Sequence, residues 1–378
     1  VFMIRLYKLR DYDFRLVIAL IILSFIGVLL VGSADASLQN RQLMGMILGL
    51  IIMTVISLMD FSWILNFSWV IYILNILLLL AVRLFGSDAN GATRWISIGG
   101  FRFQPTELTK IVIIIFFARF FMEHEENLNT LKTILQSIVL IAIPLALIYI
   151  QPDLKNTITV VILFCMIIYM AGLSYKIIGG TLLVAIPLAV VFLFIVMQPN
   201  QTLIADYQRD RIMSFLNSEE DEYSDDVIQQ ENSVMAIGSG QLTGKGLNNN
   251  EVSSANNGDF VSENQTDFIF SVAGEELGFV GCAAILLLLL FIVFECIRIS
   301  LRAKDTSGKL ICCGMGAIVG IQSFINIAVV TNIMPNTGTP LPFVSYGLTS
   351  MVSLYIGMGL VLNVGLQRYK KYREVDVS

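Results

Sequence analysis

The feature that most constrains this chain is a series of long stretches without a single charged residue. Seven such stretches contain no Asp, Glu, Lys or Arg, at 16–34, 42–59, 61–82, 133–152, 156–175, 177–205 and 277–294. An eighth, 310–367, is long enough for two membrane spans and is interrupted by a proline-rich patch. Because about 20 consecutive apolar residues cross the hydrocarbon core as a helix, we expect an all-α, polytopic membrane protein.

The composition excludes several kinds of chemistry. Charged residues make up 14% of the 378 residues, whereas soluble proteins contain roughly 25%. His124 is the only histidine, so neither a His-based triad nor a His-rich metal site can be the main chemistry. The five cysteines lie in or at the edge of apolar runs, which favours packing over disulfides or zinc; they are Cys165, Cys282, Cys296, Cys312 and Cys313.

We expect about ten transmembrane helices in a single domain over residues 1–378. Their ranges are 16–32, 42–58, 62–84, 106–121, 133–150, 157–173, 177–197, 267–297, 309–331 and 347–366. An even number of spans places both termini on one side of the membrane. With the termini inside, the inner segments contain fourteen Lys and Arg residues and the short outer segments contain five. Since cytoplasmic segments are enriched in these residues, both termini are predicted to be cytoplasmic, in the plasma membrane.

This orientation places one long loop, 198–266, outside the cell. It contains twelve acidic and three basic residues. The acidic pI of the chain is therefore due to the composition of this loop. The cluster Glu219–Asp226 is expected to be a solvated, flexible stretch. A loop of this length is too long for a simple connection, which favours either a function or disorder.

Polar residues gather at the outer ends of the predicted spans. The first cluster contains Arg94, Trp95, Arg102, Gln104, Glu107 and Lys110. Pro105 predicts a helix start, and Glu107 and Lys110 are three residues apart, so they share a helix face and can neutralise each other. The alternative for Arg94 and Trp95 is an ordinary aromatic belt with a snorkelling arginine.

Two further clusters contain carboxylates. Gln151, Asp153 and Lys155 lie between two apolar runs, where Asp153 is expected to cap the next helix. In the other cluster, a helix would place Asp267, Ser271, Gly274 and Gly278 on one face. Such a face of small residues suits either close packing or the wall of a cavity. The adjacent Glu275 and Glu276 need partners if they are buried, and carboxylates of this kind serve as general bases or cation ligands.

The fourth cluster is the segment Pro335–Gly347, which contains Ser345 and Tyr346. Three prolines and two glycines in this uncharged stretch predict a rigid, non-helical turn or re-entrant segment.

Together these motifs resemble the SEDS family (shape, elongation, division and sporulation), whose members include RodA, FtsW and SpoVE. In chain order they are Arg94-Trp95 with Phe103-Gln104-Pro105-Thr106-Glu107, Gln151-Pro152-Asp153-Leu154, Ala236-Ile237-Gly238-Ser239-Gly240 with Gly244-Lys245-Gly246, Thr266-Asp267-Phe268-Ile269-Phe270 with Gly274-Glu275-Glu276-Leu277-Gly278-Phe279, and Pro340-Leu341-Pro342-Phe343-Val344-Ser345-Tyr346-Gly347. The resemblance runs from the first span to the last and is closer to RodA-type than to FtsW-type members. Lys155 departs from the pattern, because the family usually has Gly there.

The resemblance implies a peptidoglycan glycosyltransferase that polymerises lipid II into glycan strands at the outer face of the membrane, for cell elongation and shape. It implies a class B penicillin-binding protein as partner, lipid II and nascent glycan as substrates, surrounding membrane lipids, and no nucleic acid. It maps the essential Asp of the family to Asp267 and a critical Trp to Trp95.

On chemical grounds Asp267 is predicted either to take the proton of the acceptor hydroxyl or to anchor a divalent cation, Mg²⁺ or Mn²⁺. The predicted substrate-binding residues are Arg94, Trp95, Arg102, Gln104, Glu107, Lys110, Gln151, Asp153, Lys155, Glu275, Glu276, Ser345 and Tyr346. The cationic residues among them would stabilise the diphosphate leaving group, together with the helix start near Pro105.

Two other functions fit a bundle of about ten spans. A lipid-precursor flippase or transporter has internal charges and broken helices, but it needs polar residues through the full depth of the membrane, whereas here they gather at the outer end. A non-enzymatic scaffold for a penicillin-binding protein would tolerate loss of Asp267 and Trp95.

Overall fold

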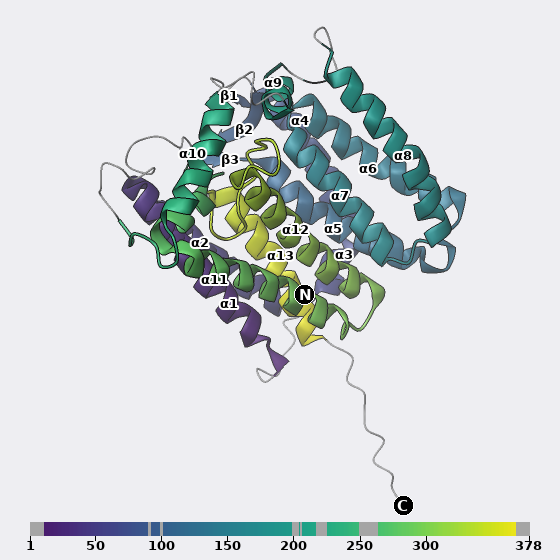
Figure 1. Cartoon of the computed structure of the whole chain (residues 1–378). Coiled ribbons are helices and arrows are strands. Elements are labelled where there is room, and N and C mark those ends of the chain that lie inside the picture. The colour runs from purple at the N-terminus through teal and green to yellow at the C-terminus, as the bar shows by residue number, and fades with distance from the viewer. Residues whose placement is uncertain are drawn as a thin grey trace, which may run out of the picture.

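The computed structural model describes residues 11–89, 92–98, 101–198, 204, 206–216, 225–248 and 264–367 (Figure 1). Almost all of the regular structure is helical. The helices are α1 (Phe14–Ala34), α2 (Ala36–Leu58), α3 (Phe61–Asn66), α4 (Ser68–Phe85), α5 (Pro105–Glu123), the 3-10 turn η2 (Glu125–Asn127), α6 (Leu131–Ile150), α7 (Leu154–Met170), α8 (Tyr175–Val196), α9 (Asp206–Leu216), α10 (Asp225–Ser239), α11 (Ile269–Ser300), α12 (Thr306–Val330) and α13 (Leu348–Leu366).

The structure confirms the prediction of a polytopic helical membrane protein. In the described part of the chain, eight helices are long and apolar enough to cross a membrane: α1, α2, α4, α6, α8, α11, α12 and α13. The remaining predicted spans coincide with α7, which is apolar but has 17 residues, and with α5, which carries charges near both ends. The predicted span 62–84 is divided, because the backbone leaves helical geometry at Phe67, between α3 and α4.

Short polar side chains begin several of these helices. Asp35 accepts a hydrogen bond from the N–H of Ser37 at 2.8 Å, and Asp305 accepts one from the N–H of Gly308 at 2.8 Å. Such caps satisfy backbone donors that have no partner within the helix. The spans α2 and α12 therefore begin where the sequence places Asp immediately before the helix.

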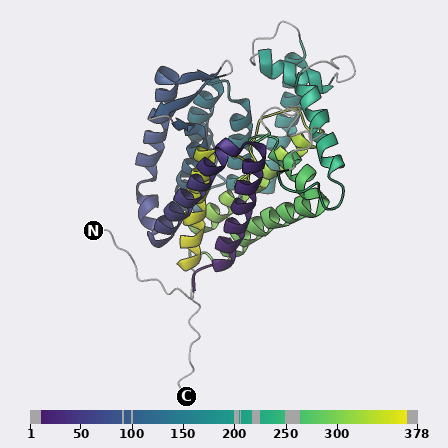
Figure 2. The same ribbon diagram turned by 90° about the vertical axis from the view of Figure 1, so that its left-hand side faces the viewer.

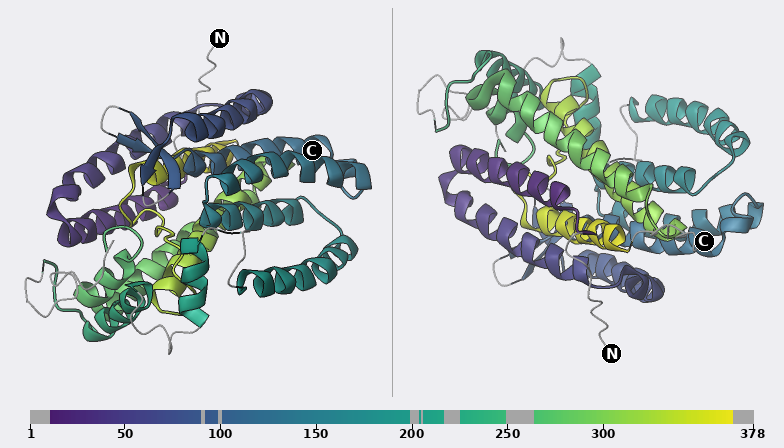
Figure 3. Two further views of the ribbon diagram at one scale, coloured as in Figure 1. Left: turned by 90° about the horizontal axis from the view of Figure 1, so that it is seen from above. Right: turned by 90° about the horizontal axis from the view of Figure 1, so that it is seen from below.

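The most enclosed helices are α5, α12 and α13. α13 packs along α2 (Figure 2), and α12 packs along α11 and also against α5 and α7. By contrast, the side chains described in α8 are almost all exposed, and this helix lies at the edge of the bundle (Figure 3). The centre of the molecule is therefore formed by the two C-terminal spans and the helix that follows Pro105.

The start of α1 and the end of α13 lie at the same end of the bundle, which we call the terminal end (Figure 1). There the Arg298 guanidinium is 2.5 Å from the Asp13 carboxylate, and the Gln367 amide donates to the Asp60 carboxylate at 2.9 Å. The first contact joins the start of α1 to the end of α11, and the second joins the end of α13 to the start of α3. The even number of predicted spans is consistent with this placement; most of the basic residues near the two chain ends lie outside the described residues.

A small sheet that the sequence analysis did not predict lies at the opposite end of the bundle (Figure 1). Its strands are β1 (Ser87–Ala89), β2 (Ala92–Ile98) and β3 (Phe101–Phe103), antiparallel and in the order β1-β2-β3. Ile98 pairs with Phe101 across the sequence Gly99-Gly100. Two glycines between apolar runs are typical of a hairpin turn, so the pairing of β2 with β3 could have been predicted from the sequence.

The loop 198–266 contains helical structure. α10 packs against α11 and α12, and the Gln230 amide donates to the carbonyls of Val329 (2.9 Å) and Met334 (2.8 Å). The carbonyl of Val330 accepts from the Ser233 hydroxyl at 2.8 Å. These bonds attach α10 to the end of α12 and to the segment that follows it. Most of the cluster Glu219–Asp226 lies outside the described residues.

The predicted face of Asp267, Ser271, Gly274 and Gly278 on one helix is wrong. Asp267 precedes α11, and α11 is broken at Gly278, which has φ 63° and ψ −164°. At the break the chain 241–246 is inserted between the two halves of the helix. The N–H groups of Phe279 and Val280 donate to the carbonyls of Gln241 (2.9 Å) and Leu242 (3.1 Å).

The carbonyls on the other side of the break are satisfied in the same way. Glu275 and Glu276 accept from the N–H groups of Lys245 and Gly246, each at 3.0 Å. Four bonds to the inserted segment thus replace the bonds that a continuous helix would make within itself. A Cβ on Gly240, Gly244 or Gly274 would meet backbone atoms of the facing segment at under 3.0 Å. The small residues of this motif therefore serve close packing.

We expect Gly278→Ala to destabilise the protein by about 1–3 kcal/mol or more, because this backbone region is essentially restricted to glycine. The added Cβ would also meet backbone atoms of Leu242 and Gly244 at under 3.0 Å. Thermal unfolding of the purified protein in detergent measures the change. The matched control is Gly179→Ala in α8, where a Cβ meets nothing within 4 Å and alanine improves helix propensity by about 1 kcal/mol. Equal unfolding temperatures for the two variants would contradict the role of Gly278.

Candidate active site at the end of the bundle opposite the chain termini

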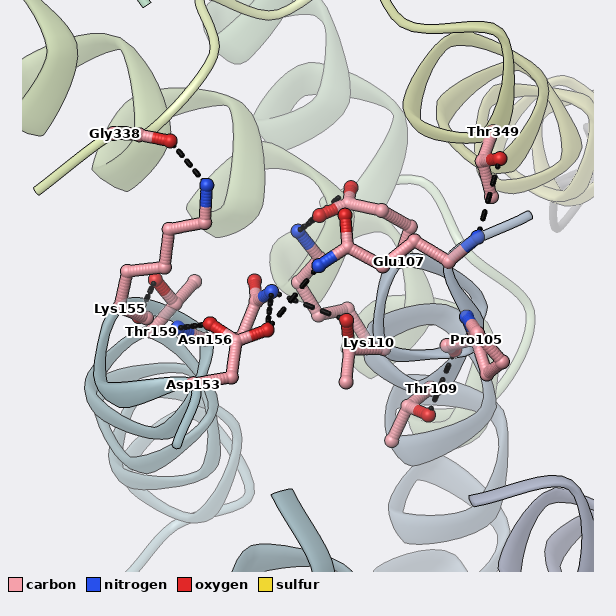
Figure 4. Close-up of polar contacts among 12 residues, drawn as sticks. Pro105, Glu107, Thr109, Lys110, Asp153, Lys155, Asn156, Thr159, Gly338 and Thr349 are labelled. Carbon is pink, nitrogen blue, oxygen red and sulfur yellow. Dashed lines mark hydrogen bonds and ion pairs between the residues drawn. The ribbon is translucent and has the colours of Figure 1, made fainter. Parts of the chain in front are cut away.

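The N-termini of α5 and α7 meet in a buried hydrogen-bond network (Figure 4). Asp153 caps α7, and its carboxylate also accepts from the side-chain amides of Gln104 (3.2 Å) and Asn156 (2.8 Å). The Asn156 amide is 3.1 Å from the Thr106 hydroxyl in the first turn of α5. The predicted cap is confirmed, and Asp153 in addition joins two helices that α6 separates in the chain.

Glu107 and Lys110 form the ion pair that their spacing predicts. The Lys110 ammonium is 2.9 Å from each carboxylate oxygen of Glu107, and the Lys110 and Glu107 side chains are 2% and 5% exposed. Glu107 is also an acidic residue in the first turn of α5, where the positive end of the helix dipole favours it. Two opposite charges are therefore held together inside the protein next to the Asp153 network (Figure 4).

Lys155 and Asp267 both approach Gly338. The Lys155 ammonium donates to the Gly338 carbonyl (Figure 4). A Cβ built on Gly338 would lie 2.8 Å from Oδ2 of Asp267 and 3.5 Å from Nζ of Lys155. Gly338 has φ +69°, a conformation that glycine adopts without strain. An ammonium from α7 and a carboxylate from the segment before α11 thus meet at one glycine of the proline-rich loop.

Asp267 is positioned by bonds between two irregular segments. The Asn326 amide donates to the carbonyls of Asp267 (2.7 Å) and Thr339 (2.8 Å). The Ser345 hydroxyl donates to the Thr266 carbonyl at 2.6 Å, and the N–H of Tyr346 donates to the Gln265 carbonyl at 2.9 Å.

The segment Pro335–Gly347 is non-helical, as predicted, and the non-helical backbone already begins at Thr331. Irregular backbone at this depth needs protein partners, and the segment before α11 supplies them. Ser345 and Tyr346 thus contact the segment that leads into Asp267, and their binding of substrate stays a prediction.

Arg94, Trp95 and Arg102 of the first cluster lie on the sheet. Arg94 in β2 donates to the carbonyls of Gln151 (3.4 Å) and Pro152, which ties the sheet to the turn before α7. Trp95 stands opposite Ser87 in the strand register and is half-buried. The Gln151 amide donates to the Leu79 carbonyl at 3.0 Å. Arg102 is exposed, and its carbonyl accepts from Thr349 at 3.3 Å.

Glu275 and Glu276 are buried next to the break in α11, and their carboxylates contact the inserted segment and α1. The Glu275 carboxylate is 2.8 Å from the Lys245 ammonium, and Glu276 accepts a hydrogen bond from the Ser33 hydroxyl. These bonds attach the inserted segment 241–246 and the end of α1 to α11. The structure thus places both glutamates with the inserted segment, and it places Asp267 with Lys155 and Gly338.

Sequence reasoning missed three residues that build this site: Asn156, Asn326 and Gly338. Asn326 is 1% exposed in the middle of an apolar span, and a buried amide needs hydrogen-bond partners. An Asn inside a predicted span was therefore a signal. Gly338 was part of the proline-rich segment, but its approach to Asp267 depends on two segments that α11 and α12 separate in the chain.

In the candidate site, the Asp267 carboxylate lies near groups of positive charge. Asp267 can accept a proton, while Lys155 and the N-termini of α5 and α7 favour an anion nearby. A carboxylate next to cationic and amide donors suits a transfer in which a hydroxyl loses its proton and an anionic group leaves.

Comparison with known proteins identifies the family. Residues 12–370 match the family of cell cycle proteins that comprises FtsW, RodA and SpoVE. The chain is 34% identical over 356 residues to the peptidoglycan glycosyltransferase MrdB of Escherichia coli K12, covering 93% of this chain and 92% of that one. It is 32% identical over 377 residues to the probable peptidoglycan glycosyltransferase FtsW of Geobacter sulfurreducens, covering 94% and 96%.

Solved structures agree with this result. A chain from a study of the structural coordination of polymerization and crosslinking by a peptidoglycan synthase complex superposes with a TM-score of 0.78 at 26% identity, covering 95% of this chain and 99% of that one. The rod shape determining protein RodA of Thermus thermophilus superposes with a TM-score of 0.68 at 25% identity, covering 95% and 98%. The chain therefore belongs to the FtsW, RodA and SpoVE family of cell cycle proteins, the SEDS family that its motifs resemble.

Proposed function

We propose that this protein is a peptidoglycan glycosyltransferase that polymerises lipid II at the outer face of the plasma membrane, for cell elongation and shape. The observation that carries the proposal is the meeting of Asp267 and Lys155 at Gly338, beside the N-termini of α5 and α7. The names of the relatives support the reaction, since MrdB of Escherichia coli is a peptidoglycan glycosyltransferase.

In this mechanism Asp267 is the general base. It takes the proton from the acceptor hydroxyl as that oxygen attacks the anomeric carbon of the donor sugar. The bond from that carbon to the lipid diphosphate breaks, and its electron pair leaves with the diphosphate. Such a positioned base contributes about 10²–10⁴-fold to a rate. Lys155 and the two helix N-termini would lower the energy of the departing anion.

The outward orientation rests on charge. The terminal end of the bundle holds basic residues such as Arg298 and Lys304, and basic segments face the cytoplasm. The end that holds Asp267 then faces outside, where a cross-linking partner works. We propose a class B penicillin-binding protein as that partner, which is supported by the likeness to a chain of a peptidoglycan synthase complex.

The test is polymerisation by the purified full chain with its penicillin-binding partner in detergent or liposomes. Fluorescent lipid II is the substrate, and the expected product is a ladder of glycan chains on a gel that disappears on treatment with a muramidase. Monomeric lipid II moved across a liposome without any polymer would instead indicate a flippase. A stable complex without polymer or translocation would indicate a scaffold. Either of these results would contradict the proposed activity.

A further inference from the structure

Lys155 lies at the N-terminal end of α7, where a lysine does not stabilise the helix. It is in the first turn of α7, and the positive end of a helix dipole disfavours a cation there. The side chain is half-buried, and its ammonium donates to the Gly338 carbonyl (Figure 4). The Asp267 carboxylate approaches the same glycine. The favourable contacts of this ammonium thus lie in the candidate site and not in the helix.

The same contacts disfavour a resident divalent cation beside Asp267. Mg²⁺ has near-octahedral oxygen coordination and is usually bound by one or two carboxylates together with waters. In the described part of the chain, no three His, Cys, Asp or Glu residues are grouped to hold a metal, so a cation at Asp267 would depend on neighbouring oxygens such as the Gly338 carbonyl. The Gly338 carbonyl, which would be an available oxygen ligand, accepts from Lys155. The ammonium also brings a positive charge that repels a second cation at this place.

We propose that Lys155 supplies the positive charge beside Asp267 that a divalent cation would otherwise supply, so that polymerisation by this protein is independent of added divalent metal. The inference rests on the proposed function and specifies how its leaving group is stabilised. The proton of the acceptor goes to Asp267 and the electron pair of the broken bond goes to the diphosphate. Lys155 keeps its protons throughout and balances the charge of the diphosphate oxygens, as a lysine does in other phosphate sites.

The first measurement is the metal response of polymerisation by the full chain with its partner. In excess EDTA, wild-type protein should keep its rate to within about twofold of the rate with Mg²⁺. Lys155→Met keeps the length of the side chain and removes the charge, and it should lose about 10²-fold in EDTA, the cost of losing one charge-stabilising group. Added Mg²⁺ or Mn²⁺ should recover about tenfold or more of that loss. Lys155→Arg should have a reduced rate that does not respond to metal.

Lys304→Met is the matched control. Lys304 lies at the terminal end, where its ammonium contacts Ser62 (2.9 Å) and Gln367 (2.7 Å). We expect its metal response to equal that of wild type. If wild-type protein stops in EDTA and resumes with Mg²⁺, or if Lys155→Met and wild type respond alike, the inference is wrong.

The second measurement does not depend on turnover. Binding of Mn²⁺ is followed by electron paramagnetic resonance on the purified chain without substrate. Lys155→Met should bind Mn²⁺ at least about tenfold more tightly than wild type, and the double variant with Asp267→Asn should lose that gain. Tight Mn²⁺ binding by wild type that Asp267→Asn removes would overturn the inference. If no variant polymerises lipid II under any condition, the proposed function fails, whereas the Mn²⁺ measurement still decides the role of Lys155.

Discussion

Replacing Asp267 with Asn is expected to reduce the polymerisation rate by about 10²–10⁴-fold, the contribution of a positioned general base. An amide cannot take the proton from the acceptor hydroxyl. The substitution preserves the size of the side chain, and the bond that Asn326 donates to this residue uses its backbone carbonyl. We therefore expect the folded structure and the contacts between the two irregular segments to remain.

Three comparisons separate loss of chemistry from loss of structure. The unfolding temperature of Asp267→Asn should stay close to that of wild type. Asp267→Glu, which keeps a carboxylate at a different reach, should retain more rate than the Asn variant. Asp210→Asn in α9, where the carboxylate is exposed, should leave the rate unchanged. Full polymerisation by Asp267→Asn would remove Asp267 from the reaction.

Replacing Lys110 with Met is expected to destabilise the protein by about 3–5 kcal/mol, because it leaves a buried carboxylate without its counter-charge. The Lys110 ammonium contacts both carboxylate oxygens of Glu107, and both side chains are buried. Unfolding of the purified protein in detergent measures the loss. The double variant Glu107→Gln with Lys110→Met should recover much of it, since the isolated charge is then absent.

The exposed pair of Arg119 and Glu123 on the same helix is the matched control. Its atoms approach to 2.7 Å, but its side chains are 30% and 42% exposed. Exposed pairs contribute about 0–1 kcal/mol, so Arg119→Met should have a small effect. Equal losses for Arg119→Met and Lys110→Met would mean that burial does not determine the strength of the inner pair.

The spans were predictable because a hydrophobic run long enough to cross a membrane has few alternatives. The start of α5 at Pro105 and the cap at Asp153 followed from local rules that involve only adjacent residues. The ion pair of Glu107 and Lys110 followed from helix periodicity. The break at Gly278 did not, because glycine in an apolar run is compatible with a continuous helix, and the backbone bonds that replace the helix come from the segment 241–246.

The residues of the candidate site could be predicted from the sequence, but which of them lie together could not. In the sequence, Asp267, Lys155, Glu275 and Glu276 are all polar residues at the predicted outer ends of the spans. The structure separates them, with Lys155 beside Asp267 at Gly338 and the two glutamates bound to the inserted segment and α1. When a polar residue near the end of a span contacts a residue in a distant part of the chain, no local sequence feature identifies that residue.

By itself the sequence determined that this chain crosses the membrane many times, where most spans begin, and which short polar motifs stand at one end of them. Those properties depend on interactions with lipid and on hydrogen bonds to adjacent backbone, both of which are local. Only the tertiary structure decided that the α7 lysine and the carboxylate before α11 meet at one glycine, and that α11 opens to receive a distant loop. Those outcomes depend on which helices pack together, because packing alone brings Lys155, Asp267 and Gly338 to one place from three separate parts of the chain.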